Sequence, residues 1–260
     1  MPLPAHVDLP DPDLLMRRLR VFAMVDAIVS PEFRSFEFHP RWGRGETMGA
    51  FKNGSGDFFI AWCCGRGAVV RGFDHECVMS PFRRDPPTIW PGLLDEFPAA
   101  LEYALREPAF GDTELTFCFW NTGGGWHEAD FRRPAGPDPD GARHVLACLQ
   151  PAYARWVRTY YGQALLTTPL AAIWRGDALT PALVKALNPD ADLTAVRTEA
   201  KDLVWPFTPP ASSGPRASAA KTKSARAPRK PSPSARKPSH PTRGHARQRQ
   251  PVPARPTRRR

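Results

Sequence analysis

The sequence predicts an α+β fold: an antiparallel sheet of about five to six strands, an N-terminal helix before it, a helical C-terminal part after it, and a disordered basic tail. Three observations lead to this prediction. Apolar residues recur at helical spacing near the N-terminus, short aromatic segments alternate with glycine-rich turns in the middle, and helical patterns return after about residue 140. An order of helix, strands and helices is typical of α+β domains.

The N-terminal helix is expected to begin after Asp11, because Asp is a favoured N-cap residue and Pro12 suits the first helical position. Ser30-Pro31 ends the helical pattern. Between these signals, the apolar positions at helical spacing are Leu14, Leu15, Leu19, Phe22, Val25 and Val29. The spacing therefore predicts one long helix.

Six strands are expected, over residues 33–38, 46–52, 57–63, 68–73, 115–120 and 126–131. Asn53-Gly54-Ser55-Gly56 supplies the left-handed backbone that a hairpin turn needs, and Gly123-Gly124-Gly125 lies between the last two strands. The strand over 57–63 is apolar on both faces, so we expect it at the centre of the sheet, covered on both sides. The side chains predicted to be buried on the central strands are Phe58, Ile60, Trp62, Leu115, Phe117 and Phe119.

Helical segments are expected over residues 91–106, 142–149, 152–161, 169–175 and 180–187. Pro98 starts the second half of the first of these segments, and Thr180-Pro181 repeats the cap and proline seen at Asp11. Large apolar side chains are concentrated before residue 206, which predicts a single globular domain over residues 1–205.

The positive charge of the chain is confined to its C-terminal tail. Residues 211–260 contain 15 Lys+Arg and no Asp or Glu, whereas residues 1–210 contain 21 basic and 26 acidic residues, a net charge of −5. With nine prolines and no aromatic residue, this tail buries too little apolar surface to offset an ordering entropy of about 1–2 kcal/mol per residue. Residues 206–260 are therefore predicted to be disordered.

The basic tail has two interpretations. Its cations can neutralise phosphates without reading a base sequence, which predicts non-specific nucleic-acid binding. The candidate residues are Arg229, Lys230, Arg236, Lys237, Arg258, Arg259 and Arg260. The alternative is a low-complexity extension that binds nothing specific.

Cysteine usage and the N-terminal sequence indicate the compartment. The five cysteines form an odd set without a C-x-x-C pair, which predicts buried free thiols in a reducing compartment rather than a metal or redox site. The N-terminus lacks the charged start and apolar run of a secretion signal, and no apolar stretch approaches a membrane span. We therefore expect a cytoplasmic protein with no membrane association.

Two places combine histidine with acidic residues: Asp74-His75-Glu76, and His127-Glu128 with Asp130. In a regular strand, alternate residues point to opposite faces, so neither histidine can converge with its own acids on one ion. This parity predicts a solvated polar face rather than a metal or acid–base centre. The sequence also lacks the nucleophile-elbow, P-loop and dinucleotide motifs, so no catalytic, metal-binding or cofactor-binding residue is assigned and no cofactor is expected.

Acidic side chains on such a face, together with an aromatic anchor, are candidates for contact with a partner protein. These candidates are Asp74, Glu76, Trp126, Glu128 and Asp130.

The order of motifs in residues 46–106 resembles the strand core of the SUKH superfamily: G-x-G-D, an aromatic strand, a glycine turn, a second strand and Asp-His-Glu. The matching residues are Gly54, Gly56, Asp57, Gly72, Asp74, His75 and Glu76. Many members of that superfamily are immunity proteins that bind and neutralise toxins. The longer run over residues 31–131 is also similar to uncharacterised bacterial proteins. Either resemblance implies a binding domain without catalytic residues to transfer.

The function predicted from the sequence is therefore non-enzymatic protein binding of the immunity type, with a protein partner that could be a toxin. Two alternatives stay open. One is a metal-dependent hydrolase that uses His75 or His127 with nearby acids, and the other is a nucleic-acid accessory protein that binds through its tail.

Overall fold

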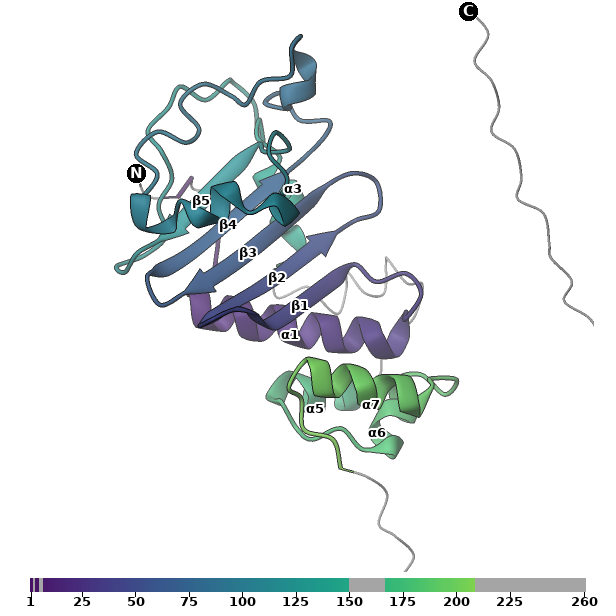
Figure 1. Cartoon of the computed structure of the whole chain (residues 1–260). Helices are drawn as coiled ribbons and strands as arrows, with labels where there is room; N and C mark the ends of the chain where they lie inside the picture. The colour runs from purple at the N-terminus through teal and green to yellow at the C-terminus, as the bar shows by residue number, and fades with distance from the viewer. Residues whose placement is uncertain (2, 5–6, 150–166, 209–260) are drawn as a thin grey trace, which may run out of the picture. The chain divides into compact units, whose positions relative to one another are not determined.

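The computed structural model describes residues 1, 3–4, 7–149 and 167–208, all of which belong to one compact unit, Met1–Ser212. Helix α1 (Pro12–Val29) precedes a five-stranded antiparallel sheet whose strand order follows the chain (Figure 1). The strands are β1 (Phe36–Gly43), β2 (Glu46–Lys52), β3 (Phe58–Cys64), β4 (Gly67–Phe73) and β5 (Phe117–Asn121). The predicted α+β class is confirmed.

Short helices make up the rest of the regular structure. The α-helices are α2 (Tyr103–Arg106), α3 (Ala142–Leu146), α5 (Thr167–Arg175), α6 (Pro181–Leu187) and α7 (Leu193–Asp202). The 3₁₀ helices are η1 (Pro81–Arg83), η2 (Ala99–Leu101), η3 (Pro108–Phe110) and η4 (Ala147–Leu149). Both predicted caps are confirmed: Asp11 accepts the N–H of Leu14 at 2.9 Å, and Thr180 Oγ1 accepts the N–H of Leu183 at 3.1 Å. Helix α7 is not among the predicted helices.

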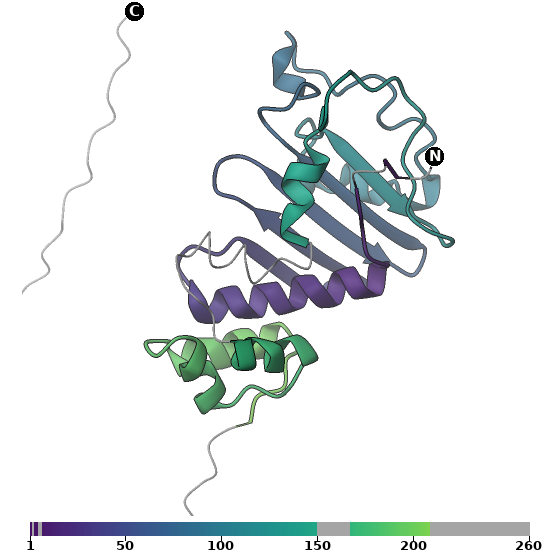
Figure 2. The ribbon, with the colours of Figure 1, turned by 180° about the vertical axis from the view of Figure 1, so that it is seen from behind.

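The sheet is covered on both faces, and β3 is its central strand, as predicted. Helices α1 and α3 lie on one face (Figure 2), where Phe59 and Ala61 join a buried cluster with residues of α1. On the opposite face, Ile60 and Trp62 belong to a second cluster, which the long connection between β4 and β5 covers. Five of the six predicted core side chains are buried, and Phe58 at the start of β3 is half-buried.

The expected strand over 126–131 does not form, and this prediction is wrong. A single bridge joins Trp120 to His127, and the ladder with β5 does not continue beyond it. The N–H of Glu128 faces away from β5 and donates to the carbonyl of Met1 at 2.9 Å, so the N-terminal segment lies along the other edge of this stretch.

The helix expected over 91–106 is reduced to η2 and α2. Residues 91–96 form turns, and Glu96 adopts a positive φ of 60°, which a right-handed helix does not accommodate. The strand expected over 33–38 starts only at Phe36, because the buried carboxylate of Asp26 accepts the N–H groups of Ser35 and Phe36, both at 2.8 Å. That contact fixes the point where the chain enters the sheet.

The predicted start of the tail at residue 206 is too early. Leu179 donates its N–H to the carbonyl of Pro206 and accepts the N–H of Thr208, both at 2.8 Å. The expected helix over 152–161 and the tail from residue 209 onward lie outside the described residues. Within the described part of the chain, no helix combines the length and the apolar character needed to cross a membrane.

Candidate functional site

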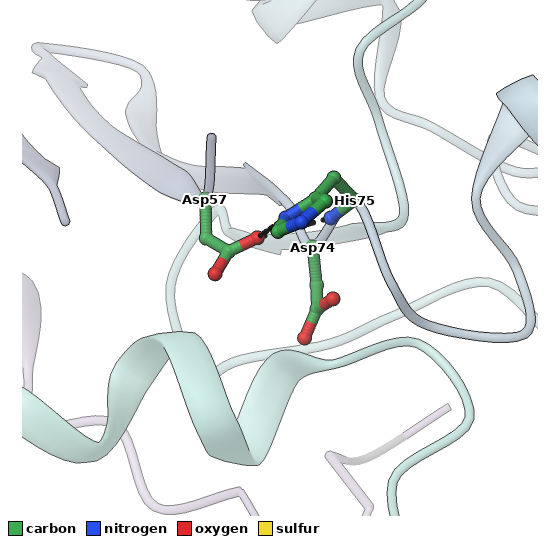
Figure 3. Close-up of side chains that lie close together, drawn as sticks. All are labelled: Asp57, Asp74 and His75. Atoms are coloured by element: carbon green, nitrogen blue, oxygen red, sulfur yellow. Dashed lines mark hydrogen bonds and ion pairs between the residues drawn. The ribbon is translucent and has the colours of Figure 1, made fainter. Parts of the chain in front are cut away.

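Three polar side chains meet where β3 begins and β4 ends: Asp57, Asp74 and His75 (Figure 3). Phe58 pairs with Phe73 in the sheet, so the residue before β3 and the residue after β4 come to lie opposite each other. Each member of this polar cluster offers one atom that could bind a metal, and these atoms lie within 4.8 Å of one another. The expectation that strand alternation keeps His75 apart from Asp74 is therefore wrong, because β4 ends at Phe73 and the alternation does not extend to these residues. Asp57, which the sequence matched to the SUKH pattern but did not indicate as a site residue, completes the cluster.

The hairpin turn before β3 positions Asp57. The side-chain oxygen of Asn53 accepts the N–H groups of Ser55 at 2.8 Å and Asp57 at 3.1 Å, and Gly54 and Gly56 supply positive φ values of 78° and 111°. Asn53 Nδ2 also donates to Asp57 Oδ2 at 2.6 Å. The turn predicted from the sequence thus also orients the carboxylate.

Asp57 and His75 form a hydrogen-bonded pair. His75 Nδ1 lies 2.6 Å from Asp57 Oδ1, and the backbone N–H of His75 donates to the same oxygen at 3.0 Å. His144 Nε2, on α3, lies 3.6 Å from Asp57 Oδ2. Burial alone raises the pKa of Asp57, but the hydrogen bonds from His75 and Asn53 outweigh it and hold that pKa below its usual value. The hydrogen bond to Asp57 in turn raises the pKa of His75.

Asp74 stabilises the turn after β4 and is buried. Its Oδ1 accepts the N–H groups of Glu76 and Cys77, both at 2.9 Å, so the side chain closes the turn locally. The backbone of Gly141 approaches Asp74 so closely that a Cβ at position 141 would lie 2.2 Å from the Asp74 Cβ. The expectation that Asp74 lies on a solvated face is wrong.

Glu128 is also buried, contrary to expectation. It forms a network with Arg133 and the fully buried Asp140. Arg133 donates to Glu128 Oε1 at 3.2 Å and Oε2 at 2.6 Å, and its Nη2 lies 3.0 Å from Asp140 Oδ2. Because residues 126–131 do not form a strand, the alternation that placed Glu128 on an exposed face does not apply.

Trp126 is the third candidate that the structure buries, since its ring lies in the core cluster of α1 and its Nε1 donates to the carbonyl of Pro10 at 2.7 Å. Glu76 and Asp130 are exposed, as expected. Whether these two contact a partner stays a prediction.

Asp74 and His75 begin a loop, residues 74–84, that is fixed from several sides. Arg83 donates to the carbonyls of Cys77, at 2.7 Å, and Glu76. Met79 donates its N–H to the carbonyl of Pro139 at 3.0 Å, and the ring of Phe82 packs edge-on against Phe73 with centroids 5.7 Å apart. These contacts join the loop to the sheet and to the segment before α3.

This loop nevertheless presents large side chains to solvent. Val78 is 51% exposed and Phe82 is 54% exposed, and the side chain of Glu76 beside them is 85% exposed. We refer to Glu76, Val78 and Phe82 as the loop surface. This loop therefore combines a fixed backbone with two exposed apolar side chains.

The polar cluster contains groups that can transfer protons or bind a metal ion, but several of their atoms already take part in hydrogen bonds. The Asp57–His75 contact would orient the imidazole for proton transfer, and His75 Nε2 lies 3.7 Å from Glu76 Oε1. Among the described residues, no hydroxyl or thiol group forms a hydrogen bond with this histidine. Backbone N–H groups already donate to Asp57 Oδ1 and to Asp74 Oδ1, so a metal ion would share these carboxylates with the hydrogen bonds that hold the turn.

The cysteines offer no activated thiol near the cluster. All five are free, as expected, but only Cys77, Cys118 and Cys148 are buried, whereas Cys63 and Cys64 are partly exposed. Burial raises the pKa of Cys77 to about 11 and that of Cys118 to about 12, so both are protonated near neutral pH. Since the thiolate is the nucleophile, these side chains are suited to packing rather than to reaction.

Comparison of the chain with protein-family models, with curated proteins and with solved structures gives no match. The resemblance to the SUKH superfamily therefore stays an expectation.

The Asp57–His75 pair predicts a pH-dependent contribution to stability. Because folding raises the pKa of His75, this histidine stabilises the fold fully below its unfolded-state pKa of about 6.5. The stabilisation is lost as the pH rises through its folded-state pKa. Because folding lowers the pKa of Asp57, this carboxylate stabilises the fold fully above its unfolded-state pKa of about 3.9. The stabilisation is lost as the pH falls through its folded-state pKa. We expect His75→Gln to lower the melting temperature most between about pH 4 and 6.5, and progressively less above about pH 7.

The control for this measurement is His39→Gln, which changes an exposed histidine of β1 whose ring contacts Trp42. Its melting temperature should track that of the wild type across the same range. A His75→Gln penalty that stays constant from pH 5 to pH 9 would contradict the assigned ion pair.

Proposed function

We propose that the folded part of this chain is a non-enzymatic protein-binding domain that contacts its partner through the loop surface. The observation that carries the proposal is the exposure of Val78 and Phe82 on a loop whose backbone is held by Asp74, Asp57 and Arg83. Aromatic and apolar anchors supply much of the affinity in protein interfaces. A loop that is already ordered loses less entropy when it binds.

Charge favours one class of partner. Residues 1–210 carry a net charge of −5, and Glu76 stands exposed beside the two apolar anchors. A basic partner surface with an apolar pocket would complement both features and would associate faster because of the opposite charge. A toxin neutralised by an immunity protein is the partner that the SUKH resemblance implies, and that identity rests on the resemblance alone.

The proposal predicts that Phe82→Ser and Val78→Ser each reduce partner recovery by roughly tenfold or more, since losing an interface anchor costs about 2 kcal/mol. Val78 is 51% exposed, so Val78→Ser should change the melting temperature little. Phe82→Ser also removes the ring contact with Phe73 and should lower the melting temperature somewhat more. Recovery would be measured by quantitative mass spectrometry of complexes purified from native lysate. Glu76→Gln should weaken the same complex and reduce its dependence on salt.

Phe33→Ser is the matched control, because Phe33 is 77% exposed and precedes β1, which β2 and β3 separate from the strand that leads into the loop. A partner that is retained by Phe33→Ser and lost from Phe82→Ser would support the proposal. Equal recovery with all variants, or equal loss with Phe33→Ser, would exclude the loop surface as the contact.

The second candidate function, a metal-dependent hydrolase, is favoured by the closeness of the ligand atoms of Asp57, Asp74 and His75. Elemental analysis of protein purified without a His tag separates the two functions. We expect no stoichiometric metal. One metal per chain that is lost in Asp57→Asn would favour the hydrolase.

The basic tail supports a separate proposal, sequence-independent binding of nucleic acid by residues 211–260, which lie outside the described residues. Titration of duplex DNA with the full-length chain and with a chain ending at Pro210, at two salt concentrations, tests it. DNA affinity retained by the shorter chain would contradict the assignment to the tail.

A further inference from the structure

A groove with a volume of about 780 Å³ lies between α1 and the β1–β2 hairpin. Arg17 and Arg20 line it from α1, and Arg41 lines it from β1. We refer to it as the arginine groove. It shares no residue with the polar cluster or with the loop surface.

The charge of the groove is positive, although residues 1–210 have a net negative charge. Arg17 and Arg20 are three residues apart, so their side chains lie on the same side of the helix. Asp13 is the single acidic residue in the lining. Among the residues that the structure describes, neither Arg17 nor Arg41 forms an ion pair, and both are exposed. Their guanidinium groups are therefore available to an anion.

Arg20 is held in place at the groove. Its Nε donates to the carbonyl of Leu203 at 2.8 Å, its Nη2 donates to the carbonyl of Val204, and its guanidinium stacks on the ring of Trp205 at 5.0 Å. Nη1 takes no part in these bonds. A planar guanidinium fixed in this way is preorganised for a carboxylate or phosphate, which it recognises through parallel N–H donors.

Val204, which also lines the groove, has a strained backbone. Its φ is +55°, in the left-handed region that β-branched residues rarely adopt, and its side chain is 52% exposed. Its N–H donates to the carbonyl of Lys201 at 3.1 Å, and the N–H of Trp205 donates to the carbonyl of Ala200 at 2.6 Å. These are the hydrogen bonds of a Schellman motif, so the positive φ belongs to the end of α7 and places the Val204 side chain at the groove.

Apolar side chains complete the walls. Met16 and Phe38 are buried beneath the groove, and Pro40 lies beside them. A ligand that fits must therefore combine a negative charge with an apolar body. The volume lies in the range of about 300–1,000 Å³ that is usual for small-molecule sites.

We infer that the arginine groove binds a small amphiphilic anion, in which a carboxylate or phosphate group contacts the three arginines and an apolar body lies against Met16 and Phe38. This site is independent of the proposed protein-binding function, because the two surfaces have no residue in common.

The test is an NMR titration of the isotope-labelled full-length chain with 4-phenylbutyrate and with phenyl phosphate. Two matched probes each lack one half of the ligand. 4-Phenylbutyramide lacks the negative charge, and inorganic phosphate lacks the apolar body. We expect both amphiphilic anions to shift the signals of groove residues at about millimolar concentration, as befits probes of this size. The amide and inorganic phosphate should bind at least about tenfold more weakly.

Arg17→Gln and Arg41→Gln should each weaken the binding of both anions by roughly tenfold or more, because each removes a charged hydrogen-bond donor. Arg44→Gln, which changes an exposed arginine outside the groove lining, should leave binding unchanged. Three results would overturn the inference: no binding of either anion, equal binding of the amide, or binding that Arg17→Gln and Arg41→Gln leave intact. The last would show that the anions bind to cations elsewhere, such as those of the tail.

Discussion

Replacing Arg133 by Met should lower the free energy of unfolding by about 3–5 kcal/mol, the usual cost of removing the cation from a buried ion pair. Arg133 is the cation that joins Glu128, which is 3% exposed, to Asp140, which is fully buried. Met fills much of the same space, so the loss of charge rather than of volume dominates. Chemical denaturation measures the change.

Two further variants make this prediction specific. Arg132→Met changes the exposed neighbouring arginine and should cost no more than about 0.5 kcal/mol. Adding Glu128→Gln and Asp140→Asn to Arg133→Met should restore part of the lost stability, since the buried charges are then gone. A cost for Arg133→Met no larger than that for Arg132→Met would mean that the network does not hold the segment before α3.

Replacing Trp62 by Ala should cost about 3–5 kcal/mol, which many domains could barely tolerate. Trp62 is 1% exposed at the centre of β3, where it lies between Met48 of β2 and Val69 of β4. Removing its indole leaves a cavity that the surrounding strands cannot close. The denaturant midpoint should fall sharply, with the slope of the transition unchanged.

Trp174→Ala is the comparison, because Trp174 is 44% exposed and its ring packs against Phe22 with centroids 5.6 Å apart. It should cost clearly less than Trp62→Ala. An unchanged midpoint for Trp62→Ala would show that the predicted burial of the central strand is wrong.

Much of the fold could be predicted from the sequence because its signals are local. The cap at Asp11 and the apolar spacing after it define α1, and the apolar character of both faces of β3 places that strand at the centre. The missed strand over 126–131 shows the limit of such signals. Its pattern is suited to a strand, but it pairs with β5 at a single bridge, and its other edge contacts Met1, which is distant in sequence.

The candidate site was harder to predict because its contacts are long-range. Asp57 becomes the partner of His75 only through the register of β3 against β4, which can be counted from the hairpin turn. Burial of Glu128 depends on Arg133 in an irregular segment, where no periodicity applies. Arg20 contributes to the groove through carbonyls near the end of the described chain, and no local pattern indicates that contact.

The strand order of the sheet has a consequence for the sequence of folding events. Strands β1 to β4 are joined by short turns, so their pairing closes small loops, whereas β5 joins only after residues 74–116 have been enclosed. We therefore expect the four-strand meander to form before β5 docks. The loop surface begins that long connection, and its anchor at Pro139 lies beyond β5. A partner that needs Val78 and Phe82 in their final positions would thus recognise the completed fold and not its intermediates.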